Sequence, residues 1–221
     1  MERLSDFSAF AWLQPDISPG RQVYYPMILP APFEANCRIF HTIWEDLLWD
    51  DNASQAAHET YDQREEREVR IRWQTLAERG NIPYTVSIHE SHLDAVQKSI
   101  GRFMHAGEGY LDETILNPLV ELLQPYTGDE ACFFFHVFLA THNWNEPDRL
   151  YRGKLEDVLM IGRQEHPDLR LTPTYWWPES RRWCVWTDYD NESSYLCGPE
   201  QLISEVLAHP YIEALRDYRT S

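Results

Sequence analysis

The 221-residue sequence is poor in positive charge. Its 19 lysines and arginines stand against 36 aspartates and glutamates, which gives a formal net charge of −17. A charge of this size repels the phosphates of nucleic acid and the surface of anionic lipid, and it attracts a basic protein. Many soluble proteins are simply acidic, so a charge without functional meaning stays an open alternative.

Long apolar runs are missing as well. The longest candidate, Ala131 to Ala140, is interrupted by His136 and falls short of the roughly 18 residues that a membrane span needs. Residues 1–13 contain Glu2 and Asp6 and have no cationic stretch before an apolar run, so no signal peptide is expected. We therefore expect a cytoplasmic protein that does not cross a membrane.

Signatures of metal, phosphate and hydrolase sites are also lacking. The four cysteines are far apart and show no C-x-x-C spacing, which favours buried reduced thiols over a zinc site. No G-x-x-x-x-G-K-[ST], G-x-S-x-G or H-E-x-x-H motif occurs. The run Asp188-x-Asp190-x-Glu192 opens like a calcium loop, but Ser193 and Pro199 occupy the positions that need glycine and glutamate. A looser cation site there stays open, yet we expect no metal and no cofactor.

The most informative segment that is present spans Thr174 to Gly198. It predicts a β-hairpin with its turn at residues 178–180 and its second strand from Arg182 to Thr187. Apolar side chains alternate onto both faces of that second strand, so it should be covered on both sides. A short strand from Ser194 to Cys197 follows. The segment contains four of the nine tryptophans, namely Trp176, Trp177, Trp183 and Trp186.

Apolar spacing and capping residues predict most of the other elements. A helical spacing covers residues 38–48, and a long polar helix near 54–79 is predicted from Ser54 as its cap and from acid–base pairs four residues apart. A stripe of leucines and isoleucines predicts a helix that either is kinked at Pro118 or begins there. Further helices are expected at 93–103, after Gly153 and from Pro199. Strands are expected at 22–29, 83–89, 131–140 and 149–152.

These elements indicate an α+β (mixed α/β) fold in which helices flank a mainly antiparallel sheet. The length suits a single compact domain over residues 1–221. The pattern is more specific over residues 111–215 than over residues 1–110, which include the long polar helix.

Candidate site residues lie in polar loops. His142 and Trp144 belong to a loop after the phenylalanine-rich strand, and loops carry function more often than core strands do. The acids Asp188, Asp190 and Glu192 follow the hairpin. They either solvate its end or contact a basic partner.

Two other histidine positions favour structural roles. His89 and His92 are three residues apart and would share a helix face, but no further metal ligand lies near them in the sequence. His136 stands among phenylalanines and is expected to be a hydrogen-bonded core histidine.

The sequence YWWPESRRWCVWTDYDNESSYLCGPEQLISEVLAHPYIEAL resembles the C-terminal signature of a family of uncharacterised bacterial proteins common in actinobacteria. Their pattern is WWP, then W-x-V-x-T-x-x-D, a short strand with glycine, and a helix that ends in proline. LNPLVELLQPYTGDEACFFFHVFLA is similar to the helix and strand that precede it. The resemblance covers about residues 111–215 and implies no established activity. Cys197-Gly198-Pro199 departs from the family, where two glycines often occur.

The absence of a catalytic signature, together with the acidic charge, favours a non-enzymatic binding protein. The most concrete form is an immunity-type protein that neutralises a basic toxin or effector. Its contacts would involve the acids Asp188, Asp190 and Glu192, or the face with Glu65, Glu66 and Glu68, around an exposed aromatic anchor such as Trp144. The alternative is an enzyme of unrecognised type with a polar site near His142, Asp188 and Asp190.

Overall fold

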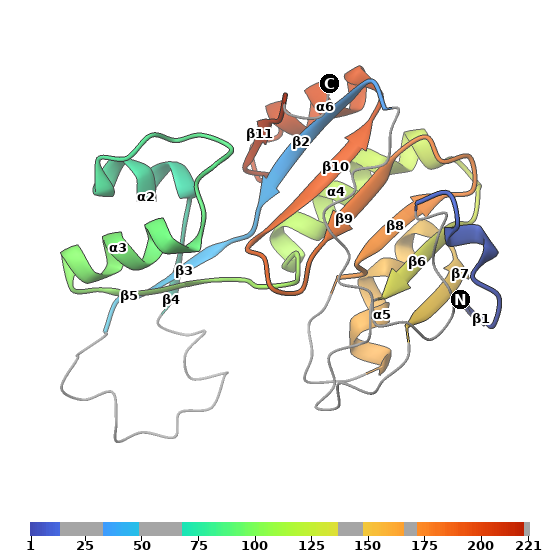
Figure 1. Ribbon diagram of the computed structural model, residues 1–221, viewed down its shortest axis with the longest axis horizontal. Coiled ribbons are helices and arrows are strands. Elements are labelled where there is room, and N and C mark those ends of the chain that lie inside the picture. The colour runs from blue at the N-terminus through green and yellow to red at the C-terminus, as the bar shows by residue number, and fades with distance from the viewer. Residues whose placement is uncertain (14–32, 49–67, 137–147, 166–171, 219–221) are drawn as a thin grey trace.

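An eight-stranded antiparallel sheet organises the protein in the computed structural model, which describes residues 1–13, 33–48, 68–136, 148–165 and 172–218 (Figure 1). Every described ladder in it is antiparallel. The α+β fold with a mainly antiparallel sheet, predicted from the sequence, is confirmed. From one edge to the other the strands are β1 (Glu2–Leu4), β7 (Arg149–Gly153), β6 (Cys132–His136), β8 (Tyr175–Pro178), β9 (Cys184–Thr187), β10 (Ser193–Gly198), β2 (Ala35–Phe40) and β11 (Ala214–Arg216).

A second, three-stranded sheet carries two helices and forms what we call the small lobe, on the left of Figure 1. Its central strand β3 (Ile43–Asp46) lies between β4 (Glu68–Ile71) and β5 (Phe103–Ala106). The helices are α2 (Trp73–Gly80) and α3 (Glu90–Ile100). Strand β2 of the large sheet continues through His41 and Thr42 into β3, so a single stretch of chain belongs to both sheets.

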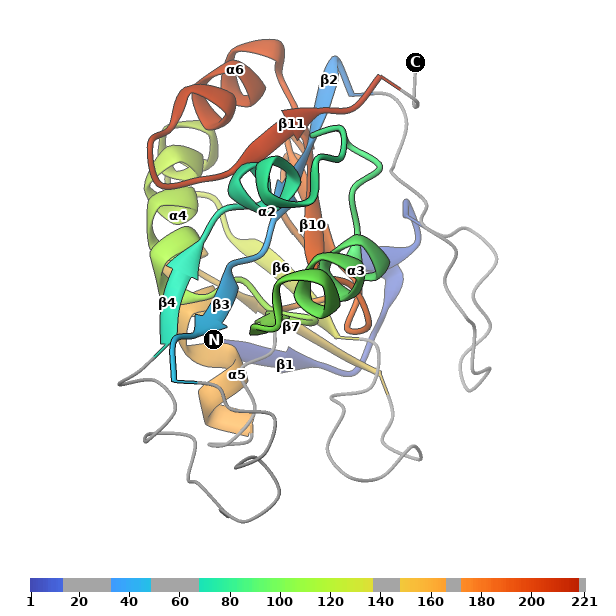
Figure 2. The same cartoon turned by 90° about the vertical axis from the view of Figure 1, so that its left-hand side faces the viewer.

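Three helices cover one face of the large sheet: α4 (Glu113–Thr127), α5 (Val158–Glu165), which follows the 3-10 turn η2 (Leu155–Asp157), and α6 (Glu200–Ala208). Figure 2 shows them along one side of the sheet. The Asp112 side chain accepts a hydrogen bond from the Thr114 backbone N–H at 2.8 Å and so caps α4. Pro118 lies inside that helix, so a helix start at Pro118 is wrong.

The opposite face of the sheet is covered by the N-terminal segment around η1 (Ser8–Phe10). The ring of Phe10 stacks on Phe135 with centroids 3.8 Å apart. The predicted burial of the hairpin on both faces is confirmed, because Trp183 packs on the helix side and Trp186 on the N-terminal side. Burying a large apolar side chain contributes about 1.5–3 kcal/mol, so both faces stabilise the strand.

The helix predicted over residues 38–48 is wrong, because this stretch forms β2 and β3. Both strands have a paired strand on each side, and β2 is buried along its whole length. A strand that is apolar on both faces also places apolar residues three and four positions apart, which imitates helical spacing.

The long polar helix predicted near 54–79 is wrong over residues 68–71 and confirmed over residues 73–79. Residues Glu68–Ile71 form strand β4 and only Trp73–Gly80 are helical, while residues 54–67 lie outside the described part. Glu68 contacts His105 on β5 rather than Arg72, because strand pairing replaces helical neighbours.

Other predicted elements differ in their bounds. No strand forms at 83–89. The helix predicted at 93–103 is present as α3 but ends at Ile100, and Phe103 already belongs to β5. The strand predicted at 22–29 lies outside the described residues. No helix in the described part of the chain is long and apolar enough to cross a membrane.

Candidate functional site

A cleft of about 480 Å³ opens where the small lobe meets the large sheet, and we call it the interlobe cleft. Its volume lies within the range of roughly 300–1,000 Å³ that is typical of ligand pockets. One wall is the end of the β9–β10 hairpin and the other is the segment between α2 and α3. The lining residues are Arg38, Val86, Ser87, His89, Trp186, Asp188, Asn191, Ser193 and Tyr195.

Strand register explains why these side chains meet. Tyr195 on β10 is paired with Trp186 on β9 and with Arg38 on β2, so the three side chains stand in one row on one face of the sheet. The same row continues through Tyr175, which the N-terminal segment covers. The small lobe covers the other end at Arg38. The interlobe cleft therefore lies over the middle of this row, between the N-terminal segment and the small lobe.

Arg38 fastens the small lobe to the hairpin. Its NH1 group donates to the carbonyl oxygens of Val86 and Ile88, both at 2.6 Å. Its Nε donates to Ser193 Oγ at 2.8 Å, and its NH2 donates to Glu192 Oε1 at 3.0 Å. Arg38 is 6% exposed and Glu192 5%, so the two form a buried ion pair. Glu192 was predicted to contact a partner, but its carboxylate is buried and paired with Arg38 within the protein.

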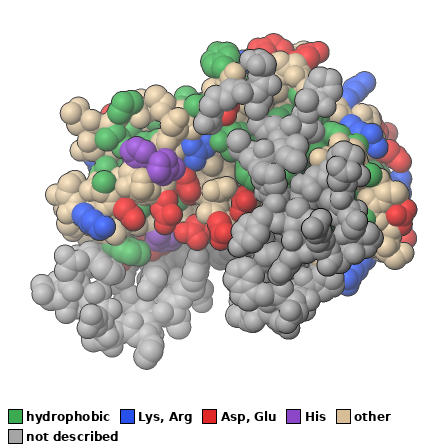
Figure 3. Space-filling view, viewed as in Figure 1, with side chains coloured by type: hydrophobic (Ala, Val, Ile, Leu, Met, Phe, Trp, Pro, Cys, Tyr) green, Lys and Arg blue, Asp and Glu red, His purple; other side chains and the backbone are tan. Residues whose placement is uncertain are grey.

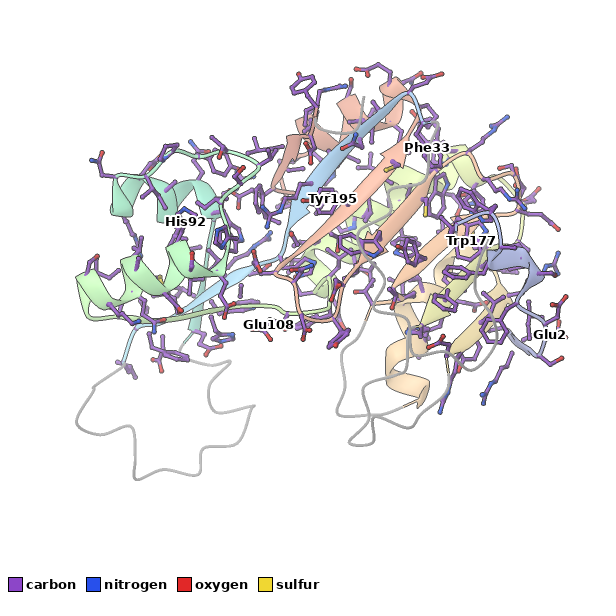
Figure 4. All side chains as sticks on the ribbon, viewed as in Figure 1. Glu2, Phe33, His92, Glu108, Trp177 and Tyr195 are labelled. Atoms are coloured by element: carbon purple, nitrogen blue, oxygen red, sulfur yellow. The ribbon has the colours of Figure 1, made fainter. Side chains whose placement is uncertain are left out.

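Gly109 holds the loop that carries a further acid, Glu108, beside a residue of the cleft, Asn191. The Gly109 backbone N–H donates to the Asn191 carbonyl oxygen at 3.0 Å, which ties the loop before α4 to the turn after β9. Gly109 has a φ of +69°, and a Cβ there would lie 2.7 Å from the Tyr189 backbone. Only glycine fits this approach without a shift. Figure 4 shows Glu108 on the segment that runs between the lobes, and Tyr195 on the sheet above it.

The acids at the mouth of the cleft repel one another. Partial burial raises the pKa of Glu108, and the carboxylates of Glu90, Asp190 and Glu192 raise it further, while His105 acts in the opposite direction. Burial also raises the pKa of Asp188, although the Asp190 backbone N–H donates to its Oδ1 at 3.0 Å and opposes the rise. Figure 3 shows acidic side chains gathered between the small lobe and the rest of the protein. The cleft therefore has a negative mouth that a cation would stabilise.

His41 and Ser194 form a pair that resembles a serine–histidine catalytic unit. His41 Nε2 lies 2.8 Å from Ser194 Oγ, which in turn lies 2.7 Å from Thr187 Oγ1. The other ring nitrogen, Nδ1, contacts the Gly107 carbonyl oxygen, so Nδ1 carries the proton and Nε2 accepts from Ser194. Burial lowers the pKa of His41 to about 4. Ser194 is 0% exposed, so no substrate reaches it and the pair is a structural link.

Of the residues predicted from the sequence, Asp188 and Asp190 come together at the cleft. His142 and Trp144 lie outside the described residues, so their place relative to these acids is not assigned.

The other two histidine predictions resolve differently. His89 caps α3 and its ring contacts that of His92, with centroids 4.5 Å apart. Within the described ranges no group of three or more histidine, cysteine, aspartate or glutamate side chains is arranged to hold a metal ion. His136 is buried, as expected for a core residue, and burial lowers its pKa to about 3. Its Nε2, however, has no hydrogen-bond partner in the described part of the chain.

Sequence reasoning missed Glu108, Arg38 and Tyr195. The Gly107-Glu108-Gly109 run was the available signal, since two glycines around one charged residue indicate a tight, exposed loop. Arg38 gave no signal, because it stands at the start of an apolar run.

No protein-family model, curated protein or solved structure matches this chain. The resemblance of residues 111–215 to a family of uncharacterised bacterial proteins stays a prediction. The chemistry of the interlobe cleft is therefore the basis for assigning a function.

Proposed function

We propose that the protein is a non-enzymatic binding protein that captures a basic protein at the interlobe cleft. In its most concrete form it is an immunity-type protein of the bacterial cytoplasm that neutralises a basic toxin or effector. The observation that carries the proposal is a concave site lined by Asp188, beside which acids from three separate segments lie close enough to repel one another: Glu90, Glu108 and Asp190.

Charge balance at the cleft supports a cationic partner. The guanidinium of Arg38 is committed to Glu192 and to two carbonyl oxygens, so it leaves the acids at the mouth without compensation. Burial is the main cause of the raised pKa of Glu108, and repulsion from the carboxylates of Glu90, Asp190 and Glu192 adds to it. A lysine or arginine that enters the mouth relieves the repulsion. The net charge of −17 adds a long-range field that speeds the encounter.

The test is affinity capture from an extract of the native host with washes of increasing salt. We expect one basic protein to be retained at low salt and released as salt rises, since screening weakens charge attraction. The captured protein is then purified and titrated directly against the full chain. If no basic protein is retained by the unaltered chain, the proposal is wrong.

Matched variants locate the contact. The triple change Glu108→Gln, Asp188→Asn and Asp190→Asn removes the charge, and asparagine at 188 keeps the hydrogen-bond acceptor for the backbone N–H of residue 190. Glu121→Gln with Asp129→Asn removes exposed acids at α4 and serves as the control. We expect the triple variant to lose the partner and the control to keep it. Equal retention by both variants would place the contact elsewhere.

One observation favours the alternative of an enzyme of unrecognised type. Asp188 lines a polar cleft and has a raised pKa, which is common among catalytic carboxyl groups. Such an enzyme would convert components of a metabolite mixture, followed by proton NMR, and Asp188→Asn would stop the conversion. A binding protein leaves the mixture unchanged.

A further inference from the structure

Two largely buried side chains in the interlobe cleft have polar groups that form no hydrogen bond to a described residue. Trp186 is 3% exposed and Tyr195 is 7% exposed, and both line the cleft. Neither the indole N–H of Trp186 nor the phenol O–H of Tyr195 has a hydrogen-bond partner among the described residues. Neither atom is among the fully buried polar atoms that lack a partner, so both groups reach the open space of the cleft, where a ligand can bond to them.

The same two rings give the cleft an aromatic wall. Their centroids lie 5.6 Å apart with 44° between the ring planes. The faces of tryptophan and tyrosine attract organic cations through the ring quadrupole, most strongly where water is excluded. The Asp188 carboxylate lines the same cleft, so an aromatic surface and an anion are available to one ligand.

Arg38 does not turn the cleft into an anion site. It donates four hydrogen bonds to protein atoms, and its charge is compensated by Glu192. An anionic ligand would also meet Glu108 and Asp190 at the mouth. The ligand is therefore cationic at the end that reaches Asp188 and apolar along the part that lies on the rings.

We propose that the interlobe cleft binds the side chain of an arginine carried by the partner protein. The inference rests on the proposed function, because it names the part of the basic partner that enters the cleft. The planar guanidinium stacks on an aromatic ring and donates two parallel hydrogen bonds to Asp188. It also donates to the Tyr195 oxygen, while the Trp186 N–H donates to a peptide carbonyl oxygen of the arginine.

The test uses the full chain with ¹⁵N-labelled tryptophan indoles and the probe N-acetyl-arginine methylamide. The Trp186 indole signal, assigned from triple-resonance spectra, is expected to shift on titration. The matched neutral probe, N-acetyl-citrulline methylamide, has nearly the same shape without the charge and should cause little shift. No movement of the Trp186 signal, or equal binding of both probes, overturns the inference.

Variants assign the contacts. Asp188→Asn should weaken binding of the arginine probe about tenfold or more, the loss expected for a charge-assisted hydrogen bond. Tyr195→Phe keeps the ring and should weaken binding a few-fold, while Asp129→Asn should leave it unchanged. Unchanged binding in Asp188→Asn contradicts the assignment of that carboxylate and overturns the site.

Two further comparisons are needed. The first asks whether the cleft prefers free arginine or an arginine within a polypeptide, and the second distinguishes failure of this inference from failure of the proposed function. Free L-arginine lacks the peptide carbonyl oxygen to which the Trp186 N–H donates in this proposal, so it should bind more weakly than the capped probe; tighter binding overturns the assignment to a partner. If the arginine probe does not bind while the acid triple variant still loses a captured basic protein, the inference fails and the proposed function stands. If the probe binds but no basic protein is captured, the proposed function fails.

Discussion

The ion pair between Arg38 and Glu192 gives the sharpest test of how the lobes are joined. Arg38→Met keeps much of the stem but removes the charge and four hydrogen bonds. It leaves Glu192, which is 5% exposed, as an uncompensated buried carboxylate. Breaking such a pair from one side costs about 3–5 kcal/mol. We expect a loss of that size in the free energy of unfolding.

The loss should be smaller when both partners change together. Replacing a buried pair by apolar residues of similar volume is often close to neutral. The double variant Arg38→Met with Glu192→Leu should therefore recover most of the stability, apart from the bonds to the Val86 and Ile88 carbonyl oxygens.

Urea unfolding followed by tryptophan fluorescence measures both variants and the single change Glu192→Leu in one double-mutant cycle. Hydrogen exchange of the α3 amides locates the effect, because Arg38 holds the segment that leads into α3. A cost below about 1 kcal/mol for Arg38→Met, the level of an exposed pair, would refute the argument. So would strictly additive effects of the two changes.

Two more predictions concern the junction. Gly109→Ala should destabilise by about 2 kcal/mol or more, because it combines a positive φ with a clash against Tyr189. Gly101→Ala shares the positive φ (+65°) but has nothing within 4 Å of its Cβ, so it should cost about 1 kcal/mol. Equal melting temperatures for the two variants would exclude the clash. His41 has a pKa of about 4 in the folded protein, below the ordinary value of 6.5. Between these pH values the unfolded chain binds a proton at this residue and the folded protein does not. The free energy of unfolding is therefore unaffected above pH 6.5 and falls by about 3 kcal/mol as the pH drops from 6.5 through 4. His41→Gln, compared with the unaltered chain in unfolding curves across this range, should show a shallower pH dependence; identical slopes would contradict the reasoning.

The sequence predicted best where both faces of an element carry a clear pattern. In the hairpin, Trp183 and Trp186 fall on opposite faces, and each found its own cluster of apolar side chains. The start of α6 after Pro199 was predictable for a local reason, since proline suits a helix N-terminus. Such features depend on a few neighbouring residues.

Residues 38–48 show where local patterns fail. Ile39 and Ile43 fit a helical stripe, but each is buried in a different sheet. The chain passes from one sheet to the other at His41 and Thr42, and these polar side chains are buried only because partners from distant segments meet them. Nothing within the segment itself reveals those partners.

Part of the candidate site could be predicted from local patterns and part could not. Asp188 and Asp190 could be predicted because they follow a recognisable hairpin. Glu108 could not be placed beside them, since that contact requires the chain to leave the small lobe after β5 and cross to the turn at Asn191. Proximity between residues about 80 positions apart is set by topology and leaves no local pattern.

The contacts that join the lobes also shape the interlobe cleft. Arg38 holds the segment from Val86 to Ile88 against the hairpin, and this segment is one wall of the cleft. Gly109 holds Glu108 near the acids of the other wall. A ligand that contacts both walls therefore adds to the same set of contacts that holds the two lobes together. Since binding to the native state adds to stability by mass action, occupation of the cleft should protect the α3 amides before it changes the helices behind the large sheet.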